Sequence, residues 1–273
     1  MIRKAIKASP ALTNRNIHIA AHGSYRSNTN VRQNSDVDIY VCCRDVLFTD
    51  FSHAQNFSES DVGFASAAYT YPIFKSEVHD ALVAHFGSGG VVSGNKAFDI
   101  QPNSYRVEAD VLPCIEYRLY TTRNQYGGFN YVSGVKAFSS KNEEIINWPE
   151  QNYENGATKN IATSHVYKKV ARIIKRLRYE MADAGNAAAS AIPSYLVECM
   201  VYNVPNGAFT HPTYTADVRH VLAHLYNALD PSGDCTKWVE INGMHYLFHP
   251  EQAWTREKAF NFVREAWNYI GFE

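Results

Sequence analysis

Two neighbouring segments carry most of the information about the fold: Gly23-Ser24-Tyr25-Arg26 and Asn34-Ser35-Asp36-Val37-Asp38-Ile39-Tyr40-Val41. The first is typical of a Gly-Ser turn after a short strand, and the second places two carboxylates at the head of an apolar strand. Residues two apart on a strand point to the same face, so Asp36 and Asp38 converge on one spot. Their charges repel unless a cation lies between them, and Mg²⁺ is a hard cation that commonly binds together with substrate phosphates. This pattern predicts nucleotide chemistry.

The composition is that of an ordinary globular protein: 273 residues, 45% hydrophobic and 19% charged, with 26 basic and 27 acidic side chains. Because the net charge is near zero, we expect no nucleic-acid template bound by a basic surface. The five cysteines show no CxxC pairing, so the sequence predicts neither zinc nor a disulfide framework, and it favours the cytoplasm. No segment has the apolar length of a signal peptide or a membrane span, so no membrane contact is expected.

The periodicity of the apolar residues predicts two lobes, 1–150 and 151–273. In the first we expect a short helix within 1–14, strands at 17–22, 36–42 and 131–138, a helix at 72–86, and a hairpin of 97–101 with 105–120. Beyond the break at 147–149 the pattern becomes helical, with an apolar stripe from Val166 to Met181 and helices near 193–203, 215–229 and 255–270. The predicted fold class is α+β.

The strand predicted from Tyr105 supplies a third carboxylate, Asp110, on a polar face that it shares with Arg106 and Glu108. With Asp36 and Asp38 it completes a two-metal site, in which the first two carboxylates bridge both ions. Asp110 then holds the second ion beside the attacking hydroxyl.

The Gly-Ser pair fits phosphate binding. A glycine at position 23 lets the backbone approach phosphate closely, and the Ser24 hydroxyl can donate to the β- or γ-phosphate. Together with the carboxylates, the pair predicts phosphoryl or nucleotidyl transfer, in which positioning and charge neutralisation supply most of the catalysis.

These motifs resemble the DNA polymerase β-like nucleotidyltransferase superfamily. Later segments resemble its cGAS/DncV-like branch, the CD-NTases; they are Ile146–Gln151, Asn155–Asn160, Ile192–Cys199 and Ala266–Phe272. The resemblance implies a polymerase β-like N-lobe with a mixed sheet, packed on a helical C-lobe and joined to it by a long spine helix. It also implies one compact bilobal unit with the active site in its cleft.

The resemblance implies a metal-dependent enzyme that makes cyclic di- or trinucleotides from ribonucleoside triphosphates and releases pyrophosphate, in bacterial anti-phage (CBASS) signalling. Its substrates would be ATP and either GTP or a pyrimidine triphosphate, with two Mg²⁺ or Mn²⁺ ions. The product would activate a downstream effector without direct contact. The alternatives are a nucleotidyltransferase acting on another acceptor (an antibiotic, a tRNA end or a protein) and a non-catalytic nucleotide-binding module.

The resemblance also assigns roles in the C-terminal half. Ser194 would contact the donor phosphates, and Tyr195 would stack on a nucleobase; the alternative for Tyr195 is packing under Pro193. An early lysine of the basic helix, Lys168 or Lys169, would reach the triphosphate. A solvated face is the alternative for this basic run.

Overall fold

The computed structural model describes residues 1–31 and 37–272. Among these residues the chain forms two compact units, one made of 1–25 with 37–149 and the other of 26–31 with 150–272. The short segment after residue 25 thus groups with the C-terminal half, whereas the sequence division at 150 assigned it to the first lobe. The lobes as functional domains stay a prediction.

The first unit is built on one sheet. Up to residue 149 the elements are α1 (Ile2–Ala8), β1 (Ile17–Ala21), α2 (Gly23–Ser27), β2 (Val37–Asp50), α3 (Glu59–Val62), α4 (Tyr71–Phe86), β3 (Val91–Ser93), β4 (Phe98–Ile100), β5 (Ala109–Arg123), β6 (Phe129–Phe138) and β7 (Glu144–Asn147). The strand order is β1-β2-β5-β4-β3, and β6 pairs with both β5 and β7. The β2–β5 pair is parallel and the others are antiparallel, so the predicted mixed sheet is confirmed.

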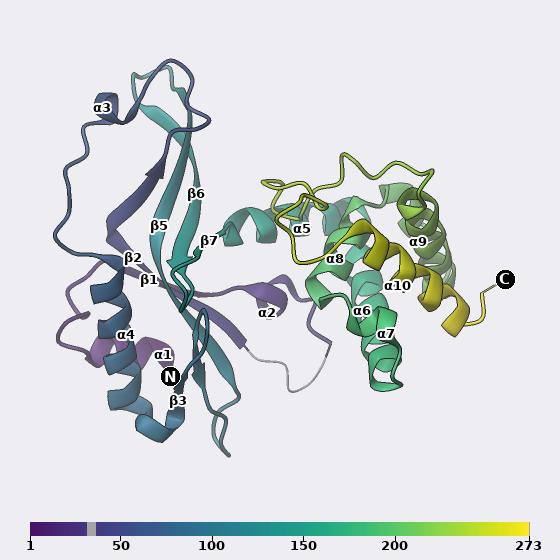
Figure 1. The fold of residues 1–273 in the computed structure, drawn as a ribbon, viewed down its shortest axis with the longest axis horizontal. Coiled ribbons are helices and arrows are strands. Elements are labelled where there is room, and N and C mark those ends of the chain that lie inside the picture. Colours follow the sequence, from purple (N-terminus) through teal and green to yellow (C-terminus); the bar gives the residue numbers. More distant parts are fainter. Residues whose placement is uncertain (32–36, 273) are drawn as a thin grey trace. The chain divides into compact units, whose positions relative to one another are not determined.

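Helices α1 and α4 lie together against one side of this sheet (Figure 1). Phe74, Val78 and Leu82 of α4 are fully buried in a core cluster that also contains Ile2 and Ile6 of α1. Their spacing is the helical repeat that predicted this element. Pro72 in the first turn and Gly87 at the C-terminal cap, with φ 80°, set its ends.

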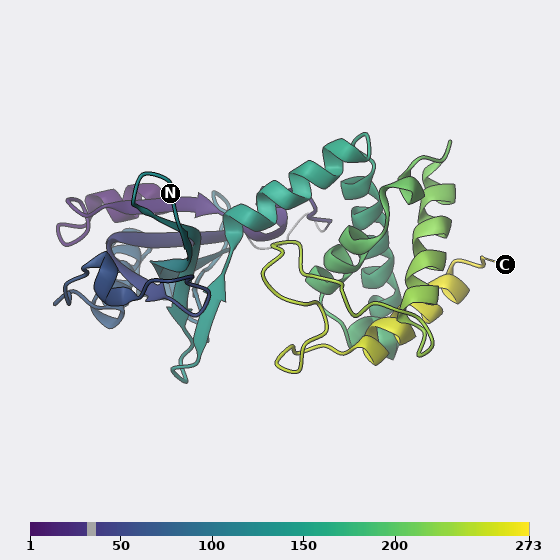
Figure 2. The same ribbon diagram turned by 90° about the horizontal axis from the view of Figure 1, so that it is seen from above.

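The second unit is helical. Its longer elements are α5 (Pro149–Ala162), α6 (Tyr167–Asp183), α8 (Ser194–Asn203), α9 (Tyr214–Leu229) and α10 (Arg256–Tyr269), with the one-turn helix α7 (Ala187–Ser190) after α6. Figure 2 shows the teal-to-yellow helices α6 to α10 gathered around a common core. Val170, Ile174 and Met181 of α6 are completely buried there, whereas Ile173 of the same predicted stripe is 37% exposed. In the described part of the chain, no helix has the length and apolar character needed to cross a bilayer.

The expected start of the second hairpin arm was wrong. The second hairpin arm begins at Ala109 rather than Tyr105, so Arg106 and Glu108 do not share a strand face with Asp110. The guanidinium of Arg106 instead donates to the Gln101 carbonyl at 2.5 Å and lies over the ring of Phe86.

Helix α5 was not predicted from the sequence. Only Gly156 in it is buried, so it shows no apolar stripe that a periodicity search could find.

Candidate active site

The sheet of the first unit aligns two of the predicted carboxylates. Asp38 on β2 and Asp110 on β5 are register partners in the parallel pair. Side chains at registered positions of adjacent strands point to the same face, and such strands lie about 4.8 Å apart. Both residues are half-buried. The prediction that Asp110 lies beside the acidic motif on a neighbouring strand therefore agrees with the structure.

The acidic pair lies on the side of the sheet opposite to the N-terminal helix. Neighbouring Val37, Ile39 and Ala109 line a cavity of about 530 Å³ together with Ile2 of α1. Because successive strand residues alternate in direction, Asp38 and Asp110 point away from this apolar cavity. The alternation leaves the carboxylate face uncovered by α1.

Gly23 lies directly against Asp38. It has φ +63°, and a Cβ atom built on it would be 2.2 Å from the Asp38 Oδ2 atom. The position requires glycine for two reasons: the left-handed backbone, and a carboxylate oxygen that occupies the place of a side chain. From the sequence, the glycine at position 23 was explained only by close approach of the backbone to phosphate, and the contact with Asp38 is an additional reason.

Ser24 is the second residue of α2 and is half-buried. The amide of His22, next to Gly23, donates to the Asp38 carbonyl at 2.9 Å, so the turn and the acidic strand are joined by backbone. The Gly-Ser turn is thereby placed beside Asp38, and the contact of Ser24 with phosphate stays a prediction.

Asp36 lies outside the described residues. Among those that are described, no group of three or more His, Cys, Asp or Glu side chains is placed to hold a metal ion. The donor set at Asp38 and Asp110 is nevertheless of the type that Mg²⁺ and Mn²⁺ prefer, because both donors are carboxylates. The missing side chain of Gly23 leaves room for the Asp38 carboxylate itself.

The sequence reasoning missed Asp99. This residue of β4 is the register partner of Asp110 on the other side, so Asp38, Asp110 and Asp99 form a row across three strands. Its carboxylate turns towards the β3–β4 hairpin, because a Cβ atom on Gly94 would be 3.1 Å from its Oδ1 atom. The sequence signal that could have identified Asp99 is the alternation Phe98-Asp99-Ile100, in which the two apolar neighbours are buried.

In the second unit the two candidate lysines of α6 point to different surroundings. Lys168 is 9% exposed, its ammonium lies 5.7 Å from the ring centre of Tyr153, and burial lowers its pKa. Arg26, two residues after Ser24, lies over the same ring at 4.8 Å. The ammonium of Lys169 instead donates to the Tyr214 hydroxyl at 2.8 Å.

Tyr195 follows Ser194 in the first turn of α8, and both side chains are half-buried. The Tyr195 hydroxyl donates to Asn152 Oδ1 at 3.0 Å and lies 3.2 Å from Glu240 Oε2, and burial raises its pKa well above the usual range. Its ring contacts Trp254 edge-on. The hydroxyl is thus fixed by the protein, and base stacking by the ring stays a prediction, as does the phosphate contact of Ser194.

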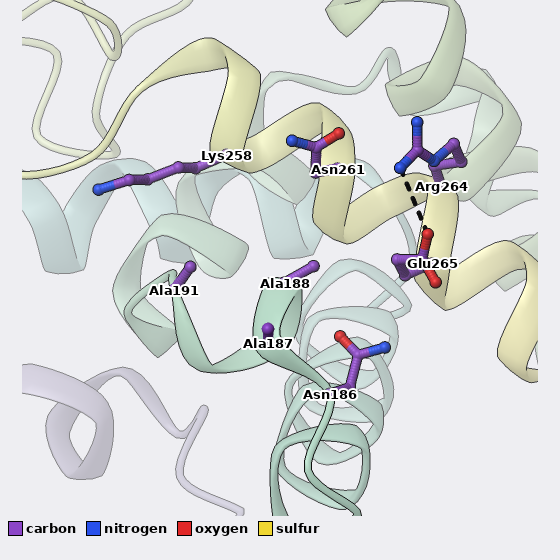
Figure 3. A pocket seen from close by; sticks show the side chains of 8 residues that line it. All are labelled: Asn186, Ala187, Ala188, Ala191, Lys258, Asn261, Arg264 and Glu265. Atoms are coloured by element: carbon purple, nitrogen blue, oxygen red, sulfur yellow. Dashed lines mark hydrogen bonds and ion pairs between the residues drawn. The ribbon is translucent and has the colours of Figure 1, made fainter.

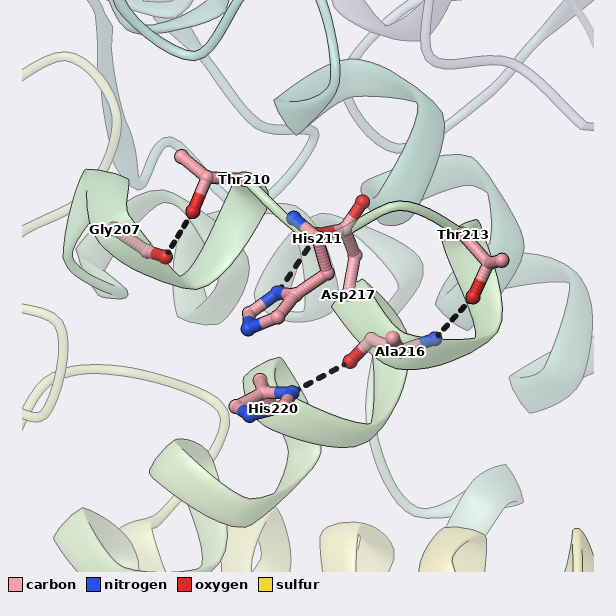
Figure 4. A network of polar contacts seen from close by, with 7 residues as sticks. All are labelled: Gly207, Thr210, His211, Thr213, Ala216, Asp217 and His220. Atoms are coloured by element: carbon pink, nitrogen blue, oxygen red, sulfur yellow. Dashed lines mark hydrogen bonds and ion pairs between the residues drawn. The ribbon is translucent and has the colours of Figure 1, made fainter.

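Two further features of the second unit contain none of the predicted residues. A cavity of about 460 Å³ opens between α7 and α10, lined by Ala188, Lys258 and the ion-paired Arg264 (Figure 3). Buried Asp217 accepts from the His211 amide at 3.0 Å, and the His211 ring stacks on His220 (Figure 4). The contacts of Asp217 and His211 hold the chain at the start of α9.

Comparison with known proteins gives consistent results over the chain. Residues 154–271 match the family described as cGAS/DncV-like nucleotidyltransferase C-terminal helical domain. The cyclic dipyrimidine nucleotide synthase CdnE of Legionella pneumophila is 43% identical over 99% of this chain and 89% of its own.

Two solved structures are similar over nearly their full length. The Elizabethkingia meningoseptica CdnE cyclic dinucleotide synthase with GTP and Apcpp has a TM-score of 0.80 and 34% identity, covering 99% of this chain and 90% of that one. The Rhodothermus marinus CdnE c-UMP-AMP synthase with Apcpp and Upnpp has a TM-score of 0.85 and 31% identity, covering 99% and 89%. The likeness therefore includes both the sheet and the helices.

The contact of Gly23 with Asp38 predicts an unequal effect of alanine at two glycines. Gly23→Ala and Gly63→Ala both place a side chain on left-handed backbone, which costs about 1–2 kcal/mol. Gly63 has φ +74° with nothing within 4 Å of its Cβ position, so it is a matched control for backbone strain alone. We expect denaturant unfolding to show a further loss of about 1–3 kcal/mol for Gly23→Ala, from overpacking. Equal losses for the two variants would contradict the contact.

Proposed function

Because this chain belongs to the cGAS/DncV-like nucleotidyltransferase family, we propose that it joins ribonucleoside triphosphates into a cyclic oligonucleotide and releases pyrophosphate at each step. The family, the enzyme class and the α+β fold predicted from the sequence are confirmed by the similarity to cyclic nucleotide synthases. The observation that carries the proposal is the register of Asp38 with Asp110 beside Gly23. It supplies the carboxylates that nucleotidyl transfer needs.

Two divalent cations, Mg²⁺ or Mn²⁺, are the proposed cofactors, held by Asp38, Asp110 and Asp36. When bound, such ions neutralise the triphosphate and make the attacking hydroxyl more acidic. In this proposal Asp36, Asp38 and Asp110 would hold the ions, and Asp110 would lie near the hydroxyl that attacks. The carboxylates act by position and charge, since phosphoryl transfer requires little covalent chemistry from the protein.

Donor phosphates are proposed to bind at the Gly-Ser turn and at the basic helix. The Ser24 hydroxyl donates to phosphate oxygen, and Ser194 at the start of α8 contributes a second hydroxyl. Between the two lysine candidates, the contacts favour Lys168: its ammonium shares the Tyr153 ring with Arg26, which is close in sequence to Ser24. Tyr195 is proposed to line the base pocket.

The relatives' names differ in the bases used: dipyrimidine in Legionella pneumophila, dipurine in Elizabethkingia meningoseptica and UMP-AMP in Rhodothermus marinus. We therefore propose the reaction and the triphosphate class for this chain, with ATP, GTP and the pyrimidine triphosphates all to be tested. Signalling in bacterial anti-phage defence, through a product-activated effector, is the proposed context.

The reaction is tested by incubating the protein with all four labelled ribonucleoside triphosphates and Mg²⁺ or Mn²⁺, then with phosphatase, before chromatography. We expect a phosphatase-resistant product that falls by at least about 100-fold in Asp38→Asn and in Asp110→Asn, because each removes a charge facing the reacting phosphate. Asp99→Asn is the matched control, since it neutralises a carboxylate in the same row. Turnover that appears only with a non-nucleotide acceptor would favour a nucleotidyltransferase acting on that acceptor. It would overturn the proposal of a cyclic product.

The lysine assignment predicts a difference between two neighbouring substitutions. Lys168→Met should raise the KM for the donor triphosphate by roughly tenfold or more, because a charge-assisted hydrogen bond to phosphate is lost. Lys169→Met, which removes only the contact with Tyr214, should leave KM within about twofold. Steady-state kinetics with each triphosphate varied in turn measures both. The reverse pattern would assign the phosphate contact to Lys169.

A further inference from the structure

An ion pair inside the second unit holds the segment between the Gly-Ser turn and the acidic strand. Lys175 of α6 and Glu198 of α8 form a salt bridge with side chains 2% and 5% exposed. The Lys175 ammonium also donates to the Thr29 carbonyl at 2.8 Å, and the Thr29 hydroxyl donates to Glu198 Oε2 at 2.7 Å. Thr29 itself is 1% exposed. A basic run on a helix ordinarily lies on a solvated face, but Lys175 is buried.

The backbone before Thr29 is held in the same way. Asn28 has φ 55°, a left-handed turn, and its carbonyl accepts from the guanidinium of Arg172. Helix α2 ends at the preceding residue, Ser27, which is buried. Because α2 spans only Gly23–Ser27, fixing the chain at Asn28 and Thr29 fixes the end of the short helix that carries Ser24 in its first turn.

Packing of the two helices does not require this pair. The cost of removing two charges from water can exceed what their attraction returns, and apolar residues of similar volume are often as stabilising or more so. The pair provides directional bonds that apolar residues lack: both Glu198 oxygens are used, one by Lys175 and one by Thr29. Methionine and leucine at these two positions could fill the space, but they could not form hydrogen bonds with Thr29.

We propose that Lys175 and Glu198 are positioning residues, which hold Asn28 and Thr29 so that Ser24, before them in the chain, and Asp38, after them, are presented for nucleotidyl transfer. The inference rests on the proposed function. Thr29 follows Ser24 by five positions and precedes Asp36 by seven, so it lies in the single segment that joins the phosphate-binding and metal-binding motifs. Neither Lys175 nor Glu198 contacts the substrate in this proposal.

The decisive variant is the double substitution Lys175→Met/Glu198→Leu, which removes both charges together and leaves no unpaired buried ion. We expect a melting temperature close to that of the unsubstituted protein. Amide hydrogen exchange in 26–31 should rise by at least about tenfold. The kcat for product formation should fall by roughly 100-fold, with KM changed much less, because a displaced group slows the reaction step. Unchanged kcat, or unchanged exchange in 26–31, would overturn the proposal.

A second pair of variants decides the matter if the double variant does not fold. Thr29→Val keeps the side-chain shape and the ion pair but removes the hydroxyl, and Thr29→Ser keeps the hydroxyl. In Thr29→Val we expect faster amide exchange in 26–31 and a lower kcat, as in the double variant. In Thr29→Ser both quantities should return towards those of the unsubstituted protein. Val221→Ala, at a fully buried position of α9, controls for a general loss of stability. It should change neither the amide exchange in 26–31 nor the kcat. Equal behaviour of the valine and serine variants would contradict the role of Thr29.

The exchange measurement does not depend on catalysis. If the unsubstituted protein makes no nucleotide product, the proposed function fails, while exchange in 26–31 still decides whether the ion pair holds the segment. If product forms normally in the double variant while exchange rises, the proposed function stands and the positioning role is overturned.

Discussion

The parallel pairing of β2 with β5 is the constraint on which the candidate site depends. It brings Asp38 beside Asp110, although 72 positions of sequence separate them, and it places both on the sheet face that α1 does not cover. Two carboxylates about 5 Å apart repel, so their proximity is unfavourable unless a cation or hydrogen-bond donors compensate it. The strand pairs on either side are antiparallel: β4 brings Asp99 into the same row, and the turn after β1 places Gly23 against Asp38. The chemistry thus follows from strand order and register.

The second unit meets a different physical requirement. Its core is apolar and continuous, and its buried ion pair Lys175–Glu198 lies where helices α6 and α8 meet the segment containing Thr29. A buried charge pair is weak evidence for stability, but its hydrogen bonds specify one arrangement of the chain. The same helix presents Lys168 and Lys169 to different neighbours. A single helix can therefore serve the core, the proposed phosphate contact and the loop.

Elements with a strong period and clear ends could be predicted from the sequence. Helix α10, with a marked apolar period and its Thr255 cap, has both, and helix α4 has clear ends at Pro72 and Gly87. Helix α5 could not be predicted, because its polar sequence buries only Gly156 and its position depends on tertiary contacts. The strand start at Ala109 could not be predicted either, because the alternation of polar and apolar residues already begins at Tyr105.

The same distinction applies to the site. Asp38, Asp110 and Gly23 could be found because their motif spacing reflects strand geometry. The position of Asp99 and the burial of Lys175 were missed: the first depends on register in a short strand, and the second on a partner, Glu198, in another helix. A basic residue in a charged run is ordinarily solvated, and only the fold shows that Lys175 is buried.

The most direct test of the central claim is the number of Mn²⁺ ions bound per chain, measured by electron paramagnetic resonance with a non-hydrolysable triphosphate analogue present. The account predicts about two ions for the unsubstituted protein, as in two-metal transfer sites, and loss of the protein-bound signal in Asp38→Asn/Asp110→Asn. The Asp99→Asn variant should bind as the unsubstituted protein does. Equal Mn²⁺ binding by the double variant and the unsubstituted protein would contradict the claim that the registered carboxylates hold the ions.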